Sequence, residues 1–309
     1  MATDFEELRE KMLQSAKEGI TEAYSSEEYA LIQAINAHLE TSKSYNLVYE
    51  RLTEWAGIYF PEIRFTNPRT LSEFALLVTK NKIDYESLYK IINDEKQAKF
   101  IHEKAKSTIG RKMNDDERKA IAGFAEMGNN MSDALVVLET YLKIASNRML
   151  PNTTYLTDEK IAAELLSKAG SMERLATMPA STIQLLGAEK SLFKHLKYGS
   201  KPPKYGVLFK MTAVNGAQRD IRGRIARVYA TKISIALKAD HYTKNFIAKE
   251  LKKSLDESIE KIKAAPIKEK KHSNNERPNP NFKRPFNRQN EGGHSHGGFG
   301  KQQRNRHKR

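Results

Sequence analysis

Apolar residues recur at helical spacing along most of the chain, which predicts a protein built from α-helices. In the first stretch they stand three or four positions apart, at Phe5, Leu8, Met12, Ala16 and Ile20. Side chains at this spacing share one face of a helix, so an amphipathic first helix is expected. Further helices are expected over 28–39, 47–59 and 71–78.

The most regular pattern begins at Ile121 and ends at Met149. Its members alternate three and four positions apart: Ile121, Phe124, Gly128, Met131, Leu135, Leu138, Leu142, Ala145 and Met149. Such an alternation is typical of a coiled-coil seam. Residues 85–109 match the pattern less well, and a polar break at 110–116 separates the two stretches. This favours an antiparallel coiled-coil hairpin over 84–150; an ordinary pair of globular helices is the alternative.

The second helix of this expected hairpin carries more apolar residues than one seam needs. Ala134, Val137, Tyr141 and Ile144 lie partly off the seam. Leftover apolar surface can be covered by a second hairpin in a four-helix bundle. We therefore expect a homodimer through the arm, with these candidate contacts: Leu135, Val137, Leu138, Tyr141 and Leu142.

The chain changes character twice after residue 150. Pro151 and Asn152 stop the long helix, and short helices follow up to residue 265. One apolar run at 205–209 predicts a buried strand or extended segment. From Pro266 onward Asn, Pro, Gly, Gln, Lys and Arg dominate, which predicts a disordered basic tail. The prediction is an all-α chain with four regions: a helical base (1–83), a coiled-coil arm (84–150), a second helical domain (151–265) and a tail (266–309).

Charge is distributed unevenly over these regions, and the net value of +15 hides this. Residues 1–189 hold 23 Lys and Arg against 29 Asp and Glu, whereas 190–253 hold 16 against three. Such asymmetry indicates a polyanion bound at one end of the molecule, the alternative being a basic surface that only aids solubility.

Sequence motifs for catalysis are missing from the chain. It has no cysteine, no GxGxxG or Walker phosphate loop and no GxSxG elbow. We therefore expect neither an enzyme nor a cofactor or metal site. The rivals are an RNA-modifying enzyme and a coiled-coil adaptor that ignores RNA. No apolar run of about 18 residues and no leader-like N-terminus occur, so a cytosolic protein is the simplest expectation.

Two basic helical stretches are the best candidates for nucleic-acid binding. Lys190, Lys194 and Lys197 are spaced to share one helical face. A row of Lys and Arg on a rigid helix can contact successive phosphates, and Arg can also stack on an unpaired base. The expected RNA contacts are Lys190, Lys194, Lys197, Lys204, Lys210, Arg222, Arg224, Arg227 and Lys232.

The same region carries a recognisable signature. The run PASTIQLLGAEK at 179–190 resembles the signature of the Nop domain, and GRIAR at 223–227 and ATKISIA at 230–236 continue it in the family's order. Upstream, the PN pair at 151–152 resembles the entrance to that domain. Within the signature, Gly187 and Ala188 would allow close approach to RNA, and Glu189 would orient its neighbours.

The resemblance implies a role. Archaeal family members are scaffolds of box C/D particles, which guide 2′-O-methylation of ribosomal RNA. Their Nop domain grips a kink-turn RNA together with a small ribosomal-type protein bound to the kink, and their coiled coil pairs two copies. A spliceosomal relative that binds a small nuclear RNA kink-turn is the runner-up. The resemblance implies a cytoplasmic setting for an archaeal chain and a nucleolar one for a eukaryotic chain.

The resemblance also implies fibrillarin, the methyltransferase, as a possible partner. In the family an N-terminal domain recruits it, and long archaeal members carry that domain before the stretch that begins here at Glu6. Whether these 309 residues bind fibrillarin is left open, with a longer parent protein and a separate chain as the two alternatives.

Overall fold

The computed structural model describes residues 2–80 and 82–265, and all regular elements in these ranges are helices. The all-α prediction is therefore confirmed. The tail predicted for 266–309 lies outside the described residues. Among the helices described, none is long and apolar enough to cross a membrane.

Helix α1 (Ala2–Ser25) forms where the first apolar pattern predicts it. Its apolar residues remain exposed, and Phe5, Leu8, Met12 and Ile20 are each more than half accessible. The Ser26 hydroxyl then accepts a hydrogen bond from the Glu28 backbone N–H and begins the next helix.

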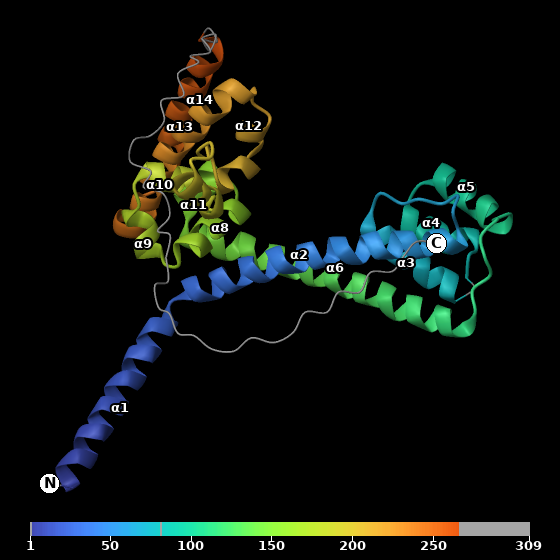
Figure 1. The fold of residues 1–309 in the computed structure, drawn as a ribbon, viewed down its shortest axis with the longest axis horizontal. Coiled ribbons are helices and arrows are strands. Elements are labelled where there is room, and N and C mark those ends of the chain that lie inside the picture. Colours follow the sequence, from blue (N-terminus) through green and yellow to red (C-terminus); the bar gives the residue numbers. More distant parts are fainter. Residues whose placement is uncertain (1, 81, 266–309) are drawn as a thin grey trace, which may run out of the picture. The chain divides into compact units, whose positions relative to one another are not determined.

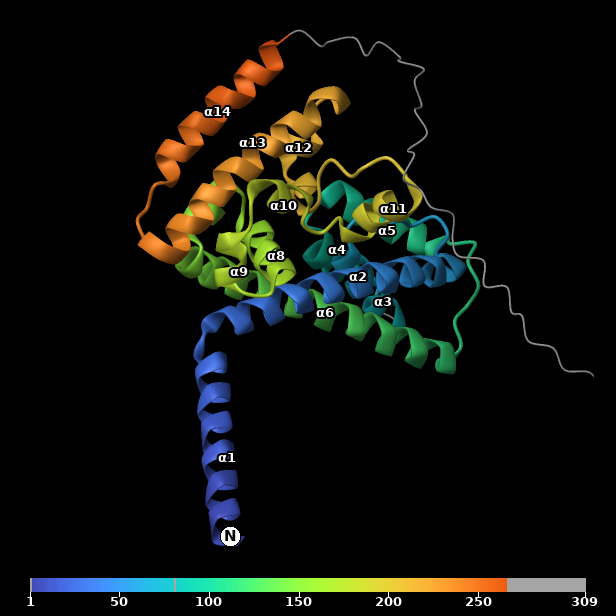
Figure 2. The same cartoon turned by 60° about the vertical axis from the view of Figure 1, so that its left-hand side comes forward.

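In the structure the arm is formed by α2 (Glu27–Tyr59) and α6 (Asp115–Met149), and from here on the name refers to these two helices. They lie side by side in Figures 1 and 2. They run antiparallel, since Arg148 near the end of α6 donates to Glu27 at the start of α2, at 2.6 Å. Further along the pair, His38 Nε2 of α2 lies 3.1 Å from Glu139 Oε1 of α6, as the antiparallel direction requires.

Helix α2 is the main partner of α6, and α3 (Pro68–Thr79) and α8 (Glu159–Ala169) also pack against it. The seam residue Gly128 lies against both Val48 of α2 and Ser72 of α3.

The predicted pairing of α6 with residues 85–109 is wrong. Those residues form two short helices, α4 (Tyr85–Ile92) and α5 (Glu95–Lys106), which pack chiefly on each other. Asn93 adopts a left-handed conformation (φ 53°) that ends α4, and the Asp94 carboxylate caps α5 by accepting from the Gln97 N–H. No continuous helix spans 85–109, so α2 covers the seam instead.

Two hydrophobic cores divide the molecule differently from the predicted base and arm. The outer core joins the far half of the arm to α3 (Pro68–Thr79), α4 and α5, and Leu52, Phe74 and Leu88 are almost inaccessible in it. The second core joins the near half of the arm to the C-terminal helices. A separate base over 1–83 is therefore wrong, because α2 is half of the arm and contributes to both cores.

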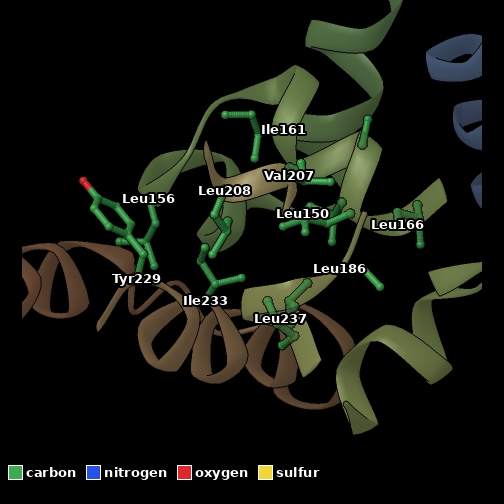
Figure 3. Close-up of a cluster of buried hydrophobic side chains, with 14 of the residues drawn as sticks. Leu150, Leu156, Ile161, Leu166, Leu186, Val207, Leu208, Tyr229, Ile233 and Leu237 are labelled. Carbon is green, nitrogen blue, oxygen red and sulfur yellow. The ribbon is translucent and has the colours of Figure 1, made fainter. Parts of the chain in front are cut away.

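The C-terminal region, the described residues from 151 to 265, forms ten elements in sequence. They are α7 (Pro151–Leu156), α8 (Glu159–Ala169), α9 (Met172–Thr177), α10 (Ala180–Leu185), α11 (Glu189–Tyr198), η1 (Val207–Lys210), α12 (Thr212–Asn215), α13 (Arg219–Lys238), η2 (Ala239–Thr243) and α14 (Ala248–Ala264). Helix α13 packs against most of the others. Figure 3 shows Tyr229 of α13 beside Leu156 and Ile233 of α13 beside Leu208 in this core.

In place of the strand or extended segment expected over 205–209, the 3-10 turn η1 begins at Val207 and ends at Lys210. Burial was correctly anticipated, since Val207 and Leu208 are nearly inaccessible. Extended pairing is limited to two backbone hydrogen bonds, from Gly206 N–H to Gln184 O at 2.9 Å and from Val207 N–H to Leu186 O at 2.7 Å. These two bonds attach the turn to α10.

One buried carboxylate ties the end of α13 to the start of α7. Asp240 is 1% exposed and accepts four hydrogen bonds: from the Asn152 N–H (2.9 Å), the Asn152 Nδ2 (2.8 Å), the Thr153 N–H (3.0 Å) and the Thr153 hydroxyl (2.7 Å). The charge is therefore well compensated, as a buried charge must be. Since α13 also carries the candidate RNA residues, this contact fixes their position within the C-terminal region.

Candidate nucleic-acid interface

Helix α13 presents a buried face and a basic face. Ile221 and Ile225 are buried in the core, whereas Arg224 and Arg227 are exposed. The two guanidinium groups line a cavity of about 600 Å³ together with Lys204, which lies in the loop before η1. The cavity lies between α10, that loop and α13, so three separate segments build it.

The loop that carries Lys204 is held in place by its neighbours. The buried Gln184 side chain donates through Nε2 to the Lys204 backbone oxygen at 2.6 Å. A Cβ at Gly206 would stand 1.9 Å from the Leu186 backbone oxygen, so only glycine fits there. The exposed Lys204 ammonium is thus presented from a fixed backbone.

The signature motif forms a tight turn before α11. Gly187 has a φ of 88°, and an added Cβ would meet the Val207 side chain at 2.7 Å, so this position requires glycine on both counts. Glu189 accepts from the Gly187 N–H at 2.6 Å and closes the turn. Ala188, half-buried, stands at the N-cap of α11.

Helix α11 has no buried residue and carries two adjacent exposed surfaces. Lys190, Lys194 and Lys197 are all exposed and share one face by their spacing. Phe193 and Leu196 lie beside them and are 68% and 63% exposed. Large apolar side chains at this exposure, next to a row of cations, favour a partner that is partly apolar and partly anionic.

Two of the predicted lysines are engaged inside the chain. The Lys210 ammonium donates at 2.5 Å to Glu164, whose side chain is only 9% exposed. Lys232 donates to the Ser254 hydroxyl of α14 at 2.8 Å. Removing Lys210 would leave a largely buried carboxylate without this cation, so its charge serves the fold.

Arg222 is engaged as well. Its guanidinium donates to the backbone oxygens of Asn215 (2.7 Å) and Ala217 (3.0 Å) and lies 5.3 Å from the Phe209 ring centre. We call Lys210, Lys232 and Arg222 the held cations. The other six predicted contacts are exposed and are called the exposed cations: Lys190, Lys194, Lys197, Lys204, Arg224 and Arg227.

Three further residues of the cavity were not among the residues predicted from the sequence. Gln184, Pro202 and Gly223 also line the cavity, and sequence reasoning did not single them out as site residues. The double proline at 202–203 was the one available signal, since it predicts a rigid loop.

Within the described residues, no group of three His, Cys, Asp or Glu side chains is placed to hold a metal ion.

The predicted dimer contacts fall into two groups. Leu142 is fully buried in the chain's own core, Leu138 packs against that core, and Leu135 is half-buried. Val137 and Tyr141 are exposed instead, by 69% and 37%. They belong to a second run on α6 with alternating steps of four and three, all of it exposed: Gly123, Met127, Asn130, Ala134, Val137, Tyr141 and Ile144, here called the outer stripe.

Comparison with known proteins identifies the family. Residues 38–261 match the family described as Nop, snoRNA binding domain, fibrillarin. A NOP5 family protein of Methanocaldococcus jannaschii is 37% identical over 268 residues, which cover 84% of this chain and 64% of that protein. Nucleolar protein 56 of Dictyostelium discoideum is 31% identical over 265 residues, covering 80% of this chain and 48% of that protein. The chain thus spans about half to two thirds of the length of these relatives.

A solved structure of a fibrillarin/Nop5p complex also aligns, with 21% sequence identity, a TM-score of 0.47, and coverage of 84% of this chain and 78% of that one. The family match extends over well more than half of the 309 residues and includes the signature turn, α11 and α13. The chain therefore belongs to the Nop-domain family.

Proposed function

We propose that this chain is a non-catalytic scaffold of a box C/D guide ribonucleoprotein, the particle that directs 2′-O-methylation of ribosomal RNA. The family description as an snoRNA-binding domain supports RNA as the polyanion. The observation that carries the proposal is α11, which presents exposed Lys190 and Lys194 beside exposed Phe193 and Leu196. The cations suit RNA phosphates and the apolar pair suits a protein surface.

The proposed ligand is therefore composite: a kink-turn RNA with its kink-turn-binding protein already attached. Charge alone would produce binding that is blind to RNA shape and strongly weakened by salt. A site that contacts RNA and protein together gains affinity only when both are present. The exposed cations are the proposed RNA contacts, and the held cations support the fold around them.

Binding measurements at physiological salt test this proposal. We expect the chain to prefer the preassembled RNA–protein complex clearly over the same RNA alone and over an unrelated duplex. Phe193→Ala with Leu196→Ala should abolish the preference for the complex and spare binding to bare RNA. Lys190→Ala with Lys194→Ala should weaken binding to every RNA. Equal affinity for the complex and the unrelated duplex would refute the composite site.

We further propose that two copies pair through the outer stripe of α6. Its members alternate four and three residues apart, as in a coiled-coil seam, yet all are exposed within one chain. Beside the stripe, α2 supplies Glu40, Thr41 and Ser44 to a shallow groove with Met127 and Ala134. A second copy of α6 could occupy such a groove in a four-helix arrangement.

Sedimentation tests the dimer. Val137→Glu with Tyr141→Lys should convert the dimer to monomers, while each monomer still binds RNA. Val136→Glu is the matched control, because Val136 is 57% exposed but lies about 100° around the helix, off the stripe. A wild-type chain that sediments as a monomer at tens of micromolar would contradict the proposal.

Fibrillarin is the proposed catalytic partner, because the family description names it and a scaffold of this kind needs a methyltransferase. Copurification of fibrillarin with the chain would locate a binding surface within these 309 residues. Methyl transfer by the chain alone, with guide and target RNA, would instead refute the scaffold assignment. The site of action would follow the particle: the cytoplasm in an archaeal cell, the nucleolus in a eukaryotic one.

A further inference from the structure

The cavity lined by Arg224 and Arg227 has features that phosphate binding does not require. Its volume of about 600 Å³ lies within the range of pockets that enclose small ligands, about 300–1,000 Å³. Leu185, Pro202 and Pro203 contribute apolar surface to its lining. A phosphate bound by surface cations needs no apolar lining, and placing a charged group against apolar surface is unfavourable.

A glycine in the second turn of α13, Gly223, lines the same cavity. Gly223 has no positive φ, and a Cβ added there would meet only the Lys204 side chain, at 3.6 Å, an ordinary contact. Glycine inside a helix costs roughly 1 kcal/mol relative to alanine. Neither backbone conformation nor packing within the chain explains Gly223, but a flat ligand lying against the helix backbone would.

The charges around the cavity narrow the ligand further. Arg224 and Arg227 supply two planar guanidinium groups, which can stack on a base as well as bind a phosphate. Asp220, one turn earlier on α13, also lines the cavity and places a carboxylate beside the two arginines. A base inside the cavity, with its phosphate outside, suits both signs of charge.

We infer that this cavity binds one unstacked nucleobase of the RNA, held between the apolar loop at 202–203 and the Gly223 surface of α13. The inference rests on the proposed function only in taking RNA as the ligand. It adds a base-dependent contribution to the phosphate contacts of the exposed cations. Stacking tolerates any base, so the gain in affinity should depend weakly on sequence.

Fluorescence anisotropy with short RNA probes tests the inference on the full chain. The probes are labelled hexamers of uridine and of adenosine, and a hexamer of abasic ribose phosphates with the same charge. We expect wild type to bind the base-bearing hexamers roughly tenfold more tightly than the abasic one. Gly223→Leu should fill the cavity and remove this difference, leaving affinity for the abasic probe unchanged. Arg224→Ala with Arg227→Ala should weaken binding to all three probes.

Folding of the filled variant can be checked independently. Leucine is a better helix former than glycine, so Gly223→Leu should keep its helical circular dichroism and its melting temperature. Ser181→Phe provides a second way to fill the cavity, from α10, at an exposed position. A 4-thiouridine in the hexamer should crosslink to peptides containing residues 202–204 or 220–227, and Gly223→Leu should abolish that crosslink.

Three outcomes would overturn the inference. The first is equal affinity of wild type for abasic and base-bearing probes. The second is an unchanged base preference in both filled variants. The third is loss of affinity for the kink-turn-binding protein alone in Gly223→Leu, which would assign the cavity to a protein side chain. If any of these occurs while the chain still prefers the preassembled complex, the cavity inference is wrong and the scaffold proposal stands. If the chain binds base-bearing probes more tightly but shows no preference for the preassembled complex, the composite-site proposal is wrong and the cavity inference stands.

Discussion

Helix α6 of the arm and helix α13 of the C-terminal region each have a buried face and an exposed face, and the two helices differ in the kind of side chain on the exposed face. Helix α6 buries its seam against α2 and exposes a second apolar stripe. Helix α13 buries its apolar face among α10, α14 and α7 and exposes Arg224 and Arg227. The buried faces explain the fold of each region, whereas the exposed faces indicate different partners: a second copy of the chain for α6 and RNA for α13.

The two regions also fix their helices by different interactions. Packing of seam residues holds α2 against α6, with polar contacts such as Arg148 to Glu27 at the exposed rim. In the C-terminal region a buried carboxylate, Asp240, and two glycines with close backbone contacts, Gly187 and Gly206, set the geometry. Polar and steric contacts of this kind specify one arrangement, so a single substitution should be more damaging there than along the arm.

The largest effect is expected from Asp240→Ala. It would leave four donors on Asn152 and Thr153 without their acceptor in the interior, and each unsatisfied donor costs about 1–3 kcal/mol. We expect a loss of at least about 3 kcal/mol in unfolding free energy. Urea unfolding followed by circular dichroism would measure it. Asp256→Ala, at an exposed ion pair, is the control and should change stability by less than about 0.5 kcal/mol; similar effects of the two would show that Asp240 is not structural.

The next largest effect separates exposed from held cations. Arg224→Ala with Arg227→Ala should weaken RNA binding at least tenfold, since each charge-assisted hydrogen bond contributes about 1.5–3 kcal/mol. Melting should hardly change, because both residues are exposed. Arg222→Ala should lower the melting temperature and leave RNA affinity nearly unchanged, because the Arg222 guanidinium donates hydrogen bonds to the backbone oxygens of Asn215 and Ala217. Binding isotherms and melting curves on the same samples measure both quantities. A large drop in the melting temperature of the Arg224 and Arg227 double variant would show that these two arginines are structural.

Two glycines of α6 should respond with opposite signs. A Cβ at Gly128 would stand 2.7 Å from the Ser72 hydroxyl, so Gly128→Ala should turn that buried hydroxyl away from its hydrogen bond to the Pro68 backbone oxygen and destabilise the arm by about 1 kcal/mol. Gly123 has nothing within 4 Å, so Gly123→Ala should add up to about 1 kcal/mol through helix propensity. Denaturant midpoints of the two variants would show this, and a shift in the same direction would contradict the packing of α3 on α6.

The smallest effect concerns the junction between the arm and α8. The Lys160 ammonium, and after it His38, holds the pKa of Glu139 below its usual range. A carboxylate with a lowered folded pKa contributes stability above its ordinary pKa of about 4.3 and loses it as pH falls through the folded value. Glu139→Gln should therefore reduce stability at pH 7 by less than about 1 kcal/mol, since the group is 46% exposed. The difference from wild type should vanish in urea titrations near pH 3; a difference independent of pH would exclude the ionic explanation.

Part of the candidate site could be predicted from local pattern alone. The shared face of Lys190, Lys194 and Lys197 follows from helical spacing, and all three are exposed. The different environments of Arg222 and Arg224 could not be predicted, because they depend on the carbonyls at the end of α12 and on the Phe209 ring. The cavity could not be predicted either, since α10, the loop at 202–204 and α13 are distant in sequence.

The sequence by itself determined the helical class, the seam on α6 and the concentration of positive charge after residue 189. Each of these depends on residue type and spacing within one segment, where side chains repeat at about 3.6 residues per turn. Only the tertiary structure decided which helix covers the seam, and it is α2 because Asn93 and Asp94 interrupt the nearer candidate. It also decided which cations are held, because a hydrogen-bond partner distant in sequence is brought near only by folding of the whole C-terminal region.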